Sequence, residues 1–281
     1  MSEKAAIVPA VTAAGAVIPK LGFGTWQLRG EPCATMVAAA LKAGYRHIDT
    51  AQGYSNEEFV GQGLKAAGVP RAEVFITTKV RPDRLTDGVL QGSVDESLRK
   101  LGVDQIDLLL IHWPNPQVPL VETIRAINAV KRDGRVKHIG LSNFTTKLLD
   151  QAWHFTTEPF AAEQIEYHPF LDQTKMINAL RARGMAIVAY CPIALGKVVG
   201  EPAIEEIGRA HNKSAAQVSL RWLVQQDGVV AIPKTANVAR LRENLEIFDF
   251  ALTDAEMARM SALARPNSRN VNEPQWVPEW D

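Results

Sequence analysis

Residues 106–114 of the chain read IDLLLIHWP, an almost unbroken apolar run that ends in a histidine, a tryptophan and a proline. Such runs are typical of parallel β-strands that are covered on both faces. Comparable short runs recur along the chain, with stretches of helical period between them. The eight predicted strands are Leu21–Gly24, Arg46–Asp49, Val74–Val80, Ile106–His112, Val136–Leu141, Ala161–Glu166, Ala186–Tyr190 and Gly228–Ile232.

The stretches between these strands carry apolar residues at helical spacing. In the segment 57–67, for example, Phe59, Val60 and Leu64 share one face. Further helices are predicted at 90–101, 121–131 and 214–225. Eight strand–helix units predict a (β/α)8 TIM barrel. A doubly wound open sheet is the alternative, because periodicity does not show whether a sheet closes.

The rest of the chain predicts small additions to a single barrel domain that spans residues 1–281. Residues 6–18 form two apolar pieces around Gly15 and predict an N-terminal β-hairpin. Two extra helices are expected, at 202–211 and 253–263, the second with Thr253 as its N-cap. The tail 265–281 is rich in Pro and Asn, and we expect it to be a surface loop.

The composition argues against several classes of protein. Lys plus Arg and Asp plus Glu both number 31, so the basic excess that is usual in nucleic-acid binders is missing. Two cysteines, Cys33 and Cys191, are too few for a disulfide framework or a Cys-rich metal site. No run approaches the roughly 18 apolar residues of a membrane helix, and no signal peptide is apparent. We therefore expect a cytoplasmic protein with no nucleic-acid or membrane partner.

Polar side chains stand at the ends of successive predicted strands, where the catalytic face of a barrel lies. Taken alone, each has an ordinary explanation: a turn cap, a lysine that reaches water, a buried histidine or a surface tyrosine. Together, an acid, an amine, an imidazole and a phenol at one face are typical of a catalytic site. The residues at these ends are Asp49, Tyr54, Lys79, His112, Ser142, Asn143, Gln164 and Tyr167.

The first four of these groups suit a proton donor for carbonyl reduction. A phenol has an ordinary pKa of about 10, and we expect the ammonium of Lys79 to lower the pKa of Tyr54. Asp49 would keep Lys79 charged, and His112 would hydrogen-bond the carbonyl oxygen of a substrate. The hydride must come from a cofactor, because no side chain supplies one.

A phosphate site is indicated late in the chain rather than at its start. The segment 22–27 reads GFGTWQ and lacks the third glycine of a GxGxxG fingerprint. Lys234, Thr235, Arg240 and Asn244 instead surround a predicted strand-to-helix junction, and cations at a helix start suit a phosphate. The alternative is an ordinary solvated helix start, with Arg240 paired to a nearby glutamate.

Taken together and in order, these motifs resemble the aldo-keto reductase superfamily, and within it the bacterial 2,5-diketo-D-gluconate reductases of the B type. The resemblance extends from Leu21 to Phe250. Its most specific stretches are Asp49–Glu57, Ile76–Lys79, Ile111–Pro114, Gly140–Phe144, Gln164–Pro169 and Ile232–Lys234.

The resemblance implies a monomeric (β/α)8 barrel that binds NADPH in extended form, holds no metal, and reduces small aldehydes or ketones. It implies a catalytic tetrad of Asp49, Tyr54, Lys79 and His112, with Tyr54 as the general acid. Trp26, His112 and Trp113 are then expected to line the substrate pocket, with Trp276 from the tail as a further candidate wall.

The resemblance also implies a set of cofactor contacts. Ser142, Asn143 and Gln164 match positions that bind the carboxamide of the nicotinamide, and Tyr167 matches the aromatic that stacks on the nicotinamide ring. The positions around the adenosine 2′-phosphate and adenine are Lys234, Thr235, Arg240 and Asn244.

The chain departs from the family pattern at two positions. Cys191 stands where many members have Ser, and a thiol is a weaker hydrogen-bond donor to a diphosphate. Asn237 stands where some relatives carry a further basic residue, which could soften a preference for NADPH.

Two other functions stay open at this level. One is an NADPH-binding redox-sensing protein with little turnover, since the barrel can hold a dinucleotide without fast chemistry. The other is a metal-dependent hydrolase, although the six scattered histidines include no H-x-H or HExxH pair.

Overall fold

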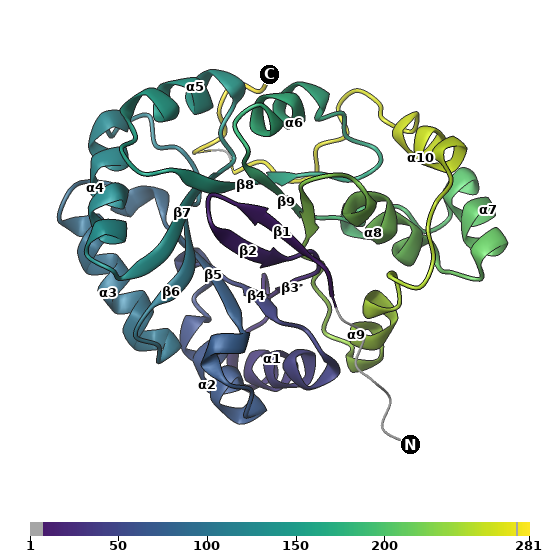
Figure 1. Ribbon diagram of the computed structural model, residues 1–281, viewed down its shortest axis with the longest axis horizontal. Helices are drawn as coiled ribbons and strands as arrows, with labels where there is room; N and C mark the ends of the chain where they lie inside the picture. Colours follow the sequence, from purple (N-terminus) through teal and green to yellow (C-terminus); the bar gives the residue numbers. More distant parts are fainter. Residues whose placement is uncertain (1–7, 274) are drawn as a thin grey trace.

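The computed structural model describes residues 8–273 and 275–281, and a ring of eight parallel strands lies at its centre (Figure 1). From β3 to β10, each strand is hydrogen-bonded to the next strand in the chain. The strands of the ring are β3 (Phe23–Gly24), β4 (His47–Asp49), β5 (Phe75–Val80), β6 (Ile106–Ile111), β7 (Val136–Ser142), β8 (Phe160–Glu166), β9 (Ala186–Tyr190) and β10 (Val229–Ala231).

The ring closes between its first and last strands. Leu21 forms a parallel bridge with Ala231, and the Gly22 N–H donates to the Ala231 carbonyl at 2.9 Å. The Ala231 N–H in turn donates to the Lys20 carbonyl at 2.9 Å. This closure confirms the predicted (β/α)8 barrel and excludes the open sheet. The first strand is shorter than predicted, because Leu21 joins the sheet only as an isolated bridge.

Helices surround the ring and bury their apolar faces against it (Figure 1). The predicted helices 57–67, 90–101, 121–131 and 214–225 are α2, α3, α4 and α8. The eight helices other than the two additions described next are α1 (Gly30–Ala43), α2 (Glu57–Ala67), α3 (Val89–Leu101), α4 (Leu120–Arg132), α5 (Thr146–Phe155), α6 (Thr174–Arg181), α8 (Ala215–Gln225) and α9 (Val238–Leu245). Within the described ranges, no helix has the length and apolar character needed to cross a membrane.

Both predicted extra helices are present, as α7 (Pro202–His211) and α10 (Asp254–Ser261). The start of α10 follows from its sequence: the Thr253 hydroxyl accepts the Glu256 N–H at 3.2 Å, and the Glu256 carboxylate accepts the Thr253 N–H at 2.7 Å. This reciprocal pair satisfies N–H groups that the first turn leaves without a helical partner.

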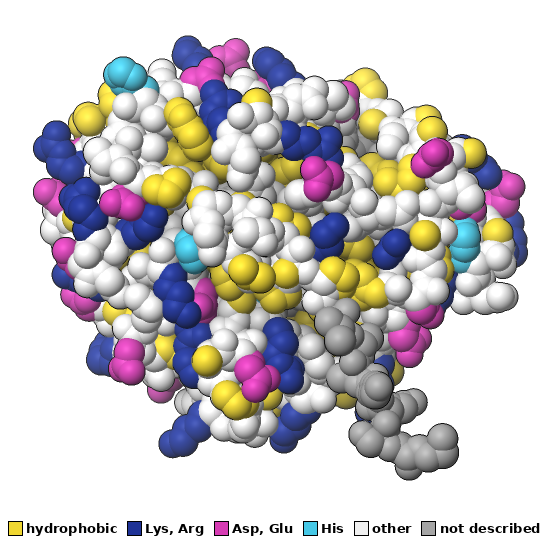
Figure 2. Space-filling view, viewed as in Figure 1, with side chains coloured by type: hydrophobic (Ala, Val, Ile, Leu, Met, Phe, Trp, Pro, Cys, Tyr) yellow, Lys and Arg dark blue, Asp and Glu magenta, His cyan; other side chains and the backbone are white. Residues whose placement is uncertain are grey.

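The amino-terminal end of the barrel is covered by an antiparallel hairpin, β1 (Ala10–Ala13) and β2 (Ala16–Pro19), seen in front of the ring in Figure 1. Its two turn residues have positive φ, 47° at Ala14 and 80° at Gly15. Val11 and Ile18 are buried in one apolar cluster with residues from inside the ring. In the space-filling view of this face, apolar side chains gather near the centre (Figure 2). The hairpin is confirmed, although residues 6 and 7 of the predicted segment lie outside the described residues.

Candidate active site

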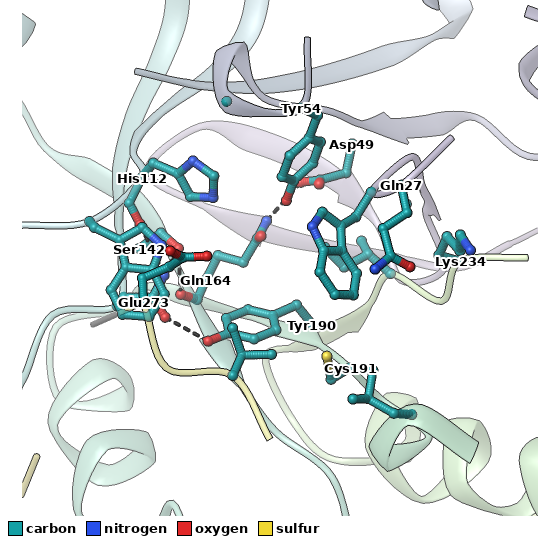
Figure 3. A pocket seen from close by; sticks show the side chains of 18 of the residues that line it. Gln27, Asp49, Tyr54, His112, Ser142, Gln164, Tyr190, Cys191, Lys234 and Glu273 are labelled. Carbon is teal, nitrogen blue, oxygen red and sulfur yellow. Dashed lines mark hydrogen bonds between the residues drawn. The ribbon is translucent and has the colours of Figure 1, made fainter. Parts of the chain in front are cut away.

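A cavity of about 900 Å³ opens at the carboxyl ends of the strands (Figure 3). The side chains and loops that line it therefore come from the ends of several different strands, as in barrel enzymes generally. The strand-end residues that line it include Asp49, Tyr54, His112, Ser142, Asn143, Gln164 and Tyr190.

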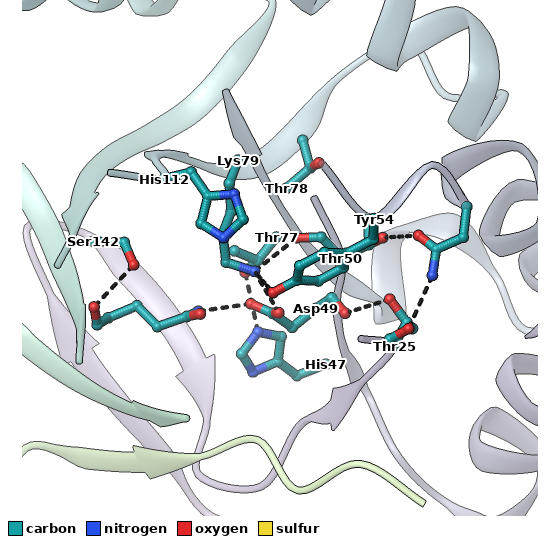
Figure 4. A network of polar contacts seen from close by, with 12 residues as sticks. Thr25, His47, Asp49, Thr50, Tyr54, Thr77, Thr78, Lys79, His112 and Ser142 are labelled. Carbon is teal, nitrogen blue, oxygen red and sulfur yellow. Dashed lines mark hydrogen bonds and ion pairs between the residues drawn. The ribbon is translucent and has the colours of Figure 1, made fainter. Parts of the chain in front are cut away.

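Lys79 and Asp49 form a buried ion pair at the floor of this cavity (Figure 4). The fully buried Lys79 Nζ lies 2.6 Å from Asp49 Oδ1 and 2.8 Å from the Thr50 carbonyl. The second Asp49 oxygen accepts from Gln164 Nε2 at 2.7 Å. A buried ion pair is tolerable only when its remaining hydrogen-bonding groups are satisfied, and here both carboxylate oxygens have partners.

Tyr54 completes the cluster from a separate short segment. Its hydroxyl lies 3.3 Å from Lys79 Nζ, and its ring meets the His112 ring edge-on with 5.6 Å between centroids. The segment is a single 3₁₀ turn, η1 (Gln52–Tyr54), and the Gln52 amide donates to Ser93 and Ser97 of α3 at 3.1 Å each. The turn that carries Tyr54 is thus tied to the helix behind it.

The electrostatics of the cluster differ from the sequence prediction in one respect. Burial, and then the negative charge of Asp49, raise the pKa of the Tyr54 hydroxyl well above its ordinary value. The prediction of a lowered pKa at Tyr54 is therefore wrong for this structure, because desolvation opposes phenolate formation more strongly than the prediction assumed. Tyr54 carries its proton at neutral pH and has one to donate.

Burial also controls the two basic groups. It lowers the pKa of His112 well below its ordinary value, and the charge of Lys79 acts in the same direction, so the imidazole is neutral at pH 7. Burial lowers the pKa of Lys79 as well, and the carboxylate of Asp49 opposes that effect.

A second polar group joins the ends of β7, β8 and β9. Ser142 Oγ donates to the Gln164 carbonyl at 3.0 Å, and Asn143 Nδ2 donates to the His112 carbonyl at 3.0 Å. The Tyr190 hydroxyl donates to Asn143 Oδ1 at 2.7 Å. Ser142, Asn143 and Gln164 are nearly fully buried, and all three line the cavity where the sequence predicts cofactor contacts.

Tyr167 is not where the sequence prediction requires it. Its ring packs against Trp222 of α8 with 5.1 Å between centroids, and its hydroxyl donates to Gln226 Oε1 at 2.9 Å. It is absent from the cavity wall, whereas Tyr190 forms part of that wall. The reason is strand alternation: Gln164 and Glu166 point into the barrel, so Tyr167 points toward the helices. The placement therefore contradicts the assignment of Tyr167 as the stacking aromatic.

Two cations lie on the cavity wall beyond the end of β10. Lys234 and Arg240 both line the cavity, and neither forms an ion pair or a side-chain hydrogen bond with any residue that the structure describes. The alternative of an Arg240–glutamate pair is therefore not what the structure contains. Asn237 is the N-cap of α9, where its Oδ1 accepts the Ala239 N–H at 2.9 Å.

The other two residues predicted beside these cations have different surroundings. Thr235 and Asn244 are both buried, and both lie outside the cavity wall. The Thr235 hydroxyl accepts the Asn237 N–H at 3.0 Å, so it helps to shape the turn before α9. Their predicted roles near a cofactor remain predictions.

Aromatic side chains form much of the wall near Tyr54. Trp26, Trp113 and Trp276 all line the cavity, as the sequence analysis expects. The tail reaches the cavity instead of lying free on the surface, since Val271, Glu273 and Gln275 line it too.

Sequence reasoning missed several wall residues. Tyr190 was detectable, because it ends a predicted strand and alternates inward with Val188. Gln27, Arg81 and Glu273 lie in loops and Leu195 lies in a short 3₁₀ turn, where no periodic signal shows direction.

The described residues contain no evident metal-binding site. Among residues 8–273 and 275–281, no group of three or more His, Cys, Asp or Glu side chains is arranged to hold a metal ion. The donors along the cavity instead suit an elongated anionic cofactor. Buried amide and hydroxyl groups line one part of it, and Lys234 and Arg240, which have no ion-pair partner among the described residues, line another.

Known proteins resemble the chain over nearly its whole length. A crystal structure named provisionally as a 2,5-diketo-D-gluconic acid reductase B superposes with a TM-score of 0.96 and 51% identity, covering 98% of both chains. The NADP complex of an aldo-keto reductase from Bombyx mori superposes with a TM-score of 0.89 and 30% identity, again covering 98% of both chains. The methylglyoxal reductase DkgB of Escherichia coli O157:H7 is 38% identical over 267 residues, which cover 94% of this chain and 99% of that protein.

The family model gives the same result from sequence alone. Residues 20–265 match the model of the aldo/keto reductase family, an interval that includes all eight strands of the ring. The fold, the strand-end cluster and these matches agree, and the chain belongs to the aldo/keto reductase family.

Proposed function

We propose that this protein is an NADPH-dependent reductase of small aldehydes and ketones, with Tyr54 as the general acid. The observation that carries the proposal is the position of Lys79 Nζ, 2.6 Å from Asp49 and 3.3 Å from the Tyr54 hydroxyl, beside His112 at the cavity floor. The family supports carbonyl reduction, and relatives named for methylglyoxal and diketogluconate support small, polar carbonyl substrates. We extend the proposal to a cytoplasmic monomer.

The chemistry divides between cofactor and side chains. Bound NADPH supplies a hydride to the carbonyl carbon. Tyr54 supplies the proton to the carbonyl oxygen, and the neighbouring ammonium of Lys79 stabilises the phenolate that remains. Neutral His112 donates a hydrogen bond that orients the carbonyl oxygen. Asp49 keeps Lys79 in place and compensates its charge while the pair is shielded from water.

The cofactor contacts follow from the cavity wall. Ser142, Asn143 and Gln164 offer buried amide and hydroxyl groups for the nicotinamide carboxamide. Tyr190 replaces Tyr167 as the aromatic beside the nicotinamide ring, because it lines the cavity wall and does not belong to the proton-donor cluster of Tyr54. Arg240 and Lys234 suit the phosphates, and the planar fork of Arg240 favours a 2′-phosphate.

Initial rates test this proposal. Purified protein should oxidise NADPH faster than NADH when methylglyoxal, simple aldehydes or keto sugars are added, and a metal chelator should leave those rates unchanged. Loss of activity on chelation would favour the metal-dependent hydrolase class. Tight NADPH binding without oxidation across the whole panel would favour a redox sensor instead.

A further inference from the structure

Glu166, at the end of β8, is a buried carboxylate that the proposed chemistry does not use. Its oxygens accept the backbone N–H of Asn270 at 2.6 Å and that of Val271 at 3.0 Å. The Asn270 side-chain amide adds a hydrogen bond at 2.9 Å, and His168 Nε2 lies 2.9 Å away. A single side chain of the barrel thus holds two consecutive residues of the C-terminal tail.

The carboxylate is in its charged form at this position. Burial alone would raise the pKa of Glu166, but the hydrogen bonds from His168, Asn270 and Val271 outweigh burial and lower the pKa below its ordinary value. Hydrogen bonds to a charged acceptor are stronger than those between neutral groups. The hydrogen bonds that join the barrel to the tail at Glu166 are therefore stronger than hydrogen bonds between neutral groups would be.

The residues that follow this contact form the substrate side of the cavity. Val271 lines the cavity directly, and Glu273, Gln275 and Trp276 follow it on the same wall. Trp113, beside His112 in the chain, lines the same cavity. The width of the cavity next to Tyr54 thus depends on where the chain runs after Asn270.

We propose that Glu166 is a positioning residue for substrate selection, whose carboxylate sets the place of the tail wall that faces the carbonyl substrate. This inference rests on the proposed reductase function for its kinetic part. Glu166 shares β8 with Gln164, which bonds Asp49, so one strand holds both the ion pair and the tail.

Other contacts hold the far end of the tail, so loss of Glu166 should loosen its middle only. The Arg269 guanidinium stacks on the Trp280 ring at 3.6 Å, and Trp280 packs edge-on against Trp113 with 6.1 Å between centroids. The Asp281 carboxylate accepts the Thr146 N–H at 2.7 Å, at the start of α5. Lys197 Nζ also donates to Asn270 Oδ1 at 2.5 Å, and Trp280 Nε1 donates to Asn272 Oδ1 at 3.2 Å. Among the described residues, however, Glu166 alone accepts the backbone N–H groups of Asn270 and Val271.

The test compares Glu166→Gln with a matched control on the same strand, Glu163→Gln. Glutamine keeps the size of the side chain, but its NH2 group replaces one of the two oxygens, so it faces either the donors of Asn270 or the N–H of Val271 and cannot accept from them. Glu163 is equally buried and accepts the Phe144 N–H at 3.0 Å, and it makes no hydrogen bond to residues 266–273 or 275–281. Burial raises the pKa of Glu163 well above its ordinary value, so its replacement by a neutral amide changes little.

The first readout is limited digestion with trypsin, which needs no catalytic activity. Arg269 precedes Asn270, whereas Arg265 is followed by Pro266 and resists trypsin. We expect Glu166→Gln to be cut after Arg269 faster than the parent protein, and Glu163→Gln to be cut at the parent rate. Equal cleavage of all three proteins overturns the inference, whatever the activity assays show.

The second readout is the split between KM and kcat. We expect Glu166→Gln to raise KM for a bulky aldehyde such as 4-nitrobenzaldehyde about tenfold, the scale of one lost apolar contact in a pocket. The KM for methylglyoxal should rise much less, because a small substrate touches less of the tail. Asn270→Ala, which keeps both backbone hydrogen bonds to Glu166, should give a smaller shift. An equal loss for both aldehydes, confined to kcat, would show a structural role only.

Discussion

The two ends of the barrel use the same strands for opposite purposes. At the amino-terminal end, His47 on β4 and Thr77 on β5 meet through a neutral hydrogen bond of 3.0 Å, under an apolar hairpin. Two residues further along the same strands, Asp49 and Lys79 form a buried ion pair. Burying a charge is costly, and on these two strands the charged pair lies where the cavity opens and the neutral pair lies under the hairpin. On β6 the buried carboxylate of Asp107 lies at the hairpin end, where Arg71 and Lys137 pair with it from partly exposed positions.

The largest expected difference between the ends is in catalysis, and Tyr54→Phe tests it. We expect kcat to fall by roughly 10² to 10⁴-fold, the usual contribution of a positioned general acid. Binding of NADPH should stay close to that of the parent, as measured by fluorescence titration. Tyr167→Phe is the matched control: it removes a buried hydroxyl outside the cavity and should retain most of kcat. Parent-like turnover in Tyr54→Phe would remove Tyr54 as the acid.

The ion pair predicts the next effect, on both activity and stability. Lys79→Met leaves Asp49 buried without its cation, which we expect to cost about 3 to 5 kcal/mol of unfolding free energy in urea. The double variant Lys79→Met with Asp49→Asn should regain much of that stability, because no unpaired charge remains, and should still be inactive. A double variant as unstable as the single one would mean that the charge is not the cause.

The neutral histidine at the hairpin end, His47, predicts that the protein becomes less stable in acid. Burial, opposed by Asp49, lowers the pKa of His47 to about 4, whereas a histidine in the unfolded chain titrates near 6.5. Between these values the unfolded chain binds the extra proton, so stability falls as the pH drops from about 6.5 to about 4, by about 3 kcal/mol.

The variant His47→Gln isolates this effect from other titrating groups, including His112 at the cavity end. When the pH is lowered from 7 to 4, the parent should lose about 3 kcal/mol more unfolding free energy than His47→Gln loses. A difference that stays constant over this range would show that His47 is not kept neutral.

The smallest effect concerns the hairpin. Ile18 is fully buried against the interior of the ring, and Ile18→Val should cost about 1 kcal/mol of stability. Its kcat should equal that of the parent, because the hairpin lies at the end away from the cavity. A change in kcat would show that the two ends are coupled.

The sequence was sufficient for the ring and much of the cavity because both depend on local patterns. Apolar runs identify the eight strands, and polar residues at or near their carboxyl ends identify Asp49, His112, Ser142 and Gln164. Strand parity, applied strictly, would also have selected Tyr190 over Tyr167. The direction of the pKa shift at Tyr54 could not be predicted from the sequence, because it depends on burial by residues distant in the chain.

The tail could not be predicted for a different reason. Its path depends on hydrogen bonds between Glu166 and residues 270 and 271, which no periodicity connects. The prediction of a surface loop rested on the Pro and Asn content of the segment, and only Trp276 was expected to line the cavity. A buried acid at the end of a strand, with no role in the proton-donor cluster, was the one available sign that something must reach it.

The closure of the ring also has a consequence for biosynthesis. Leu21 can form its bridge to Ala231, which closes the ring, only after Ala231 has been synthesised. A ribosome that adds roughly 5 to 20 residues per second needs roughly 10 to 40 s to make the intervening chain. During that interval the first strand has an unpaired edge, which exposes the nascent chain to incorrect strand pairing.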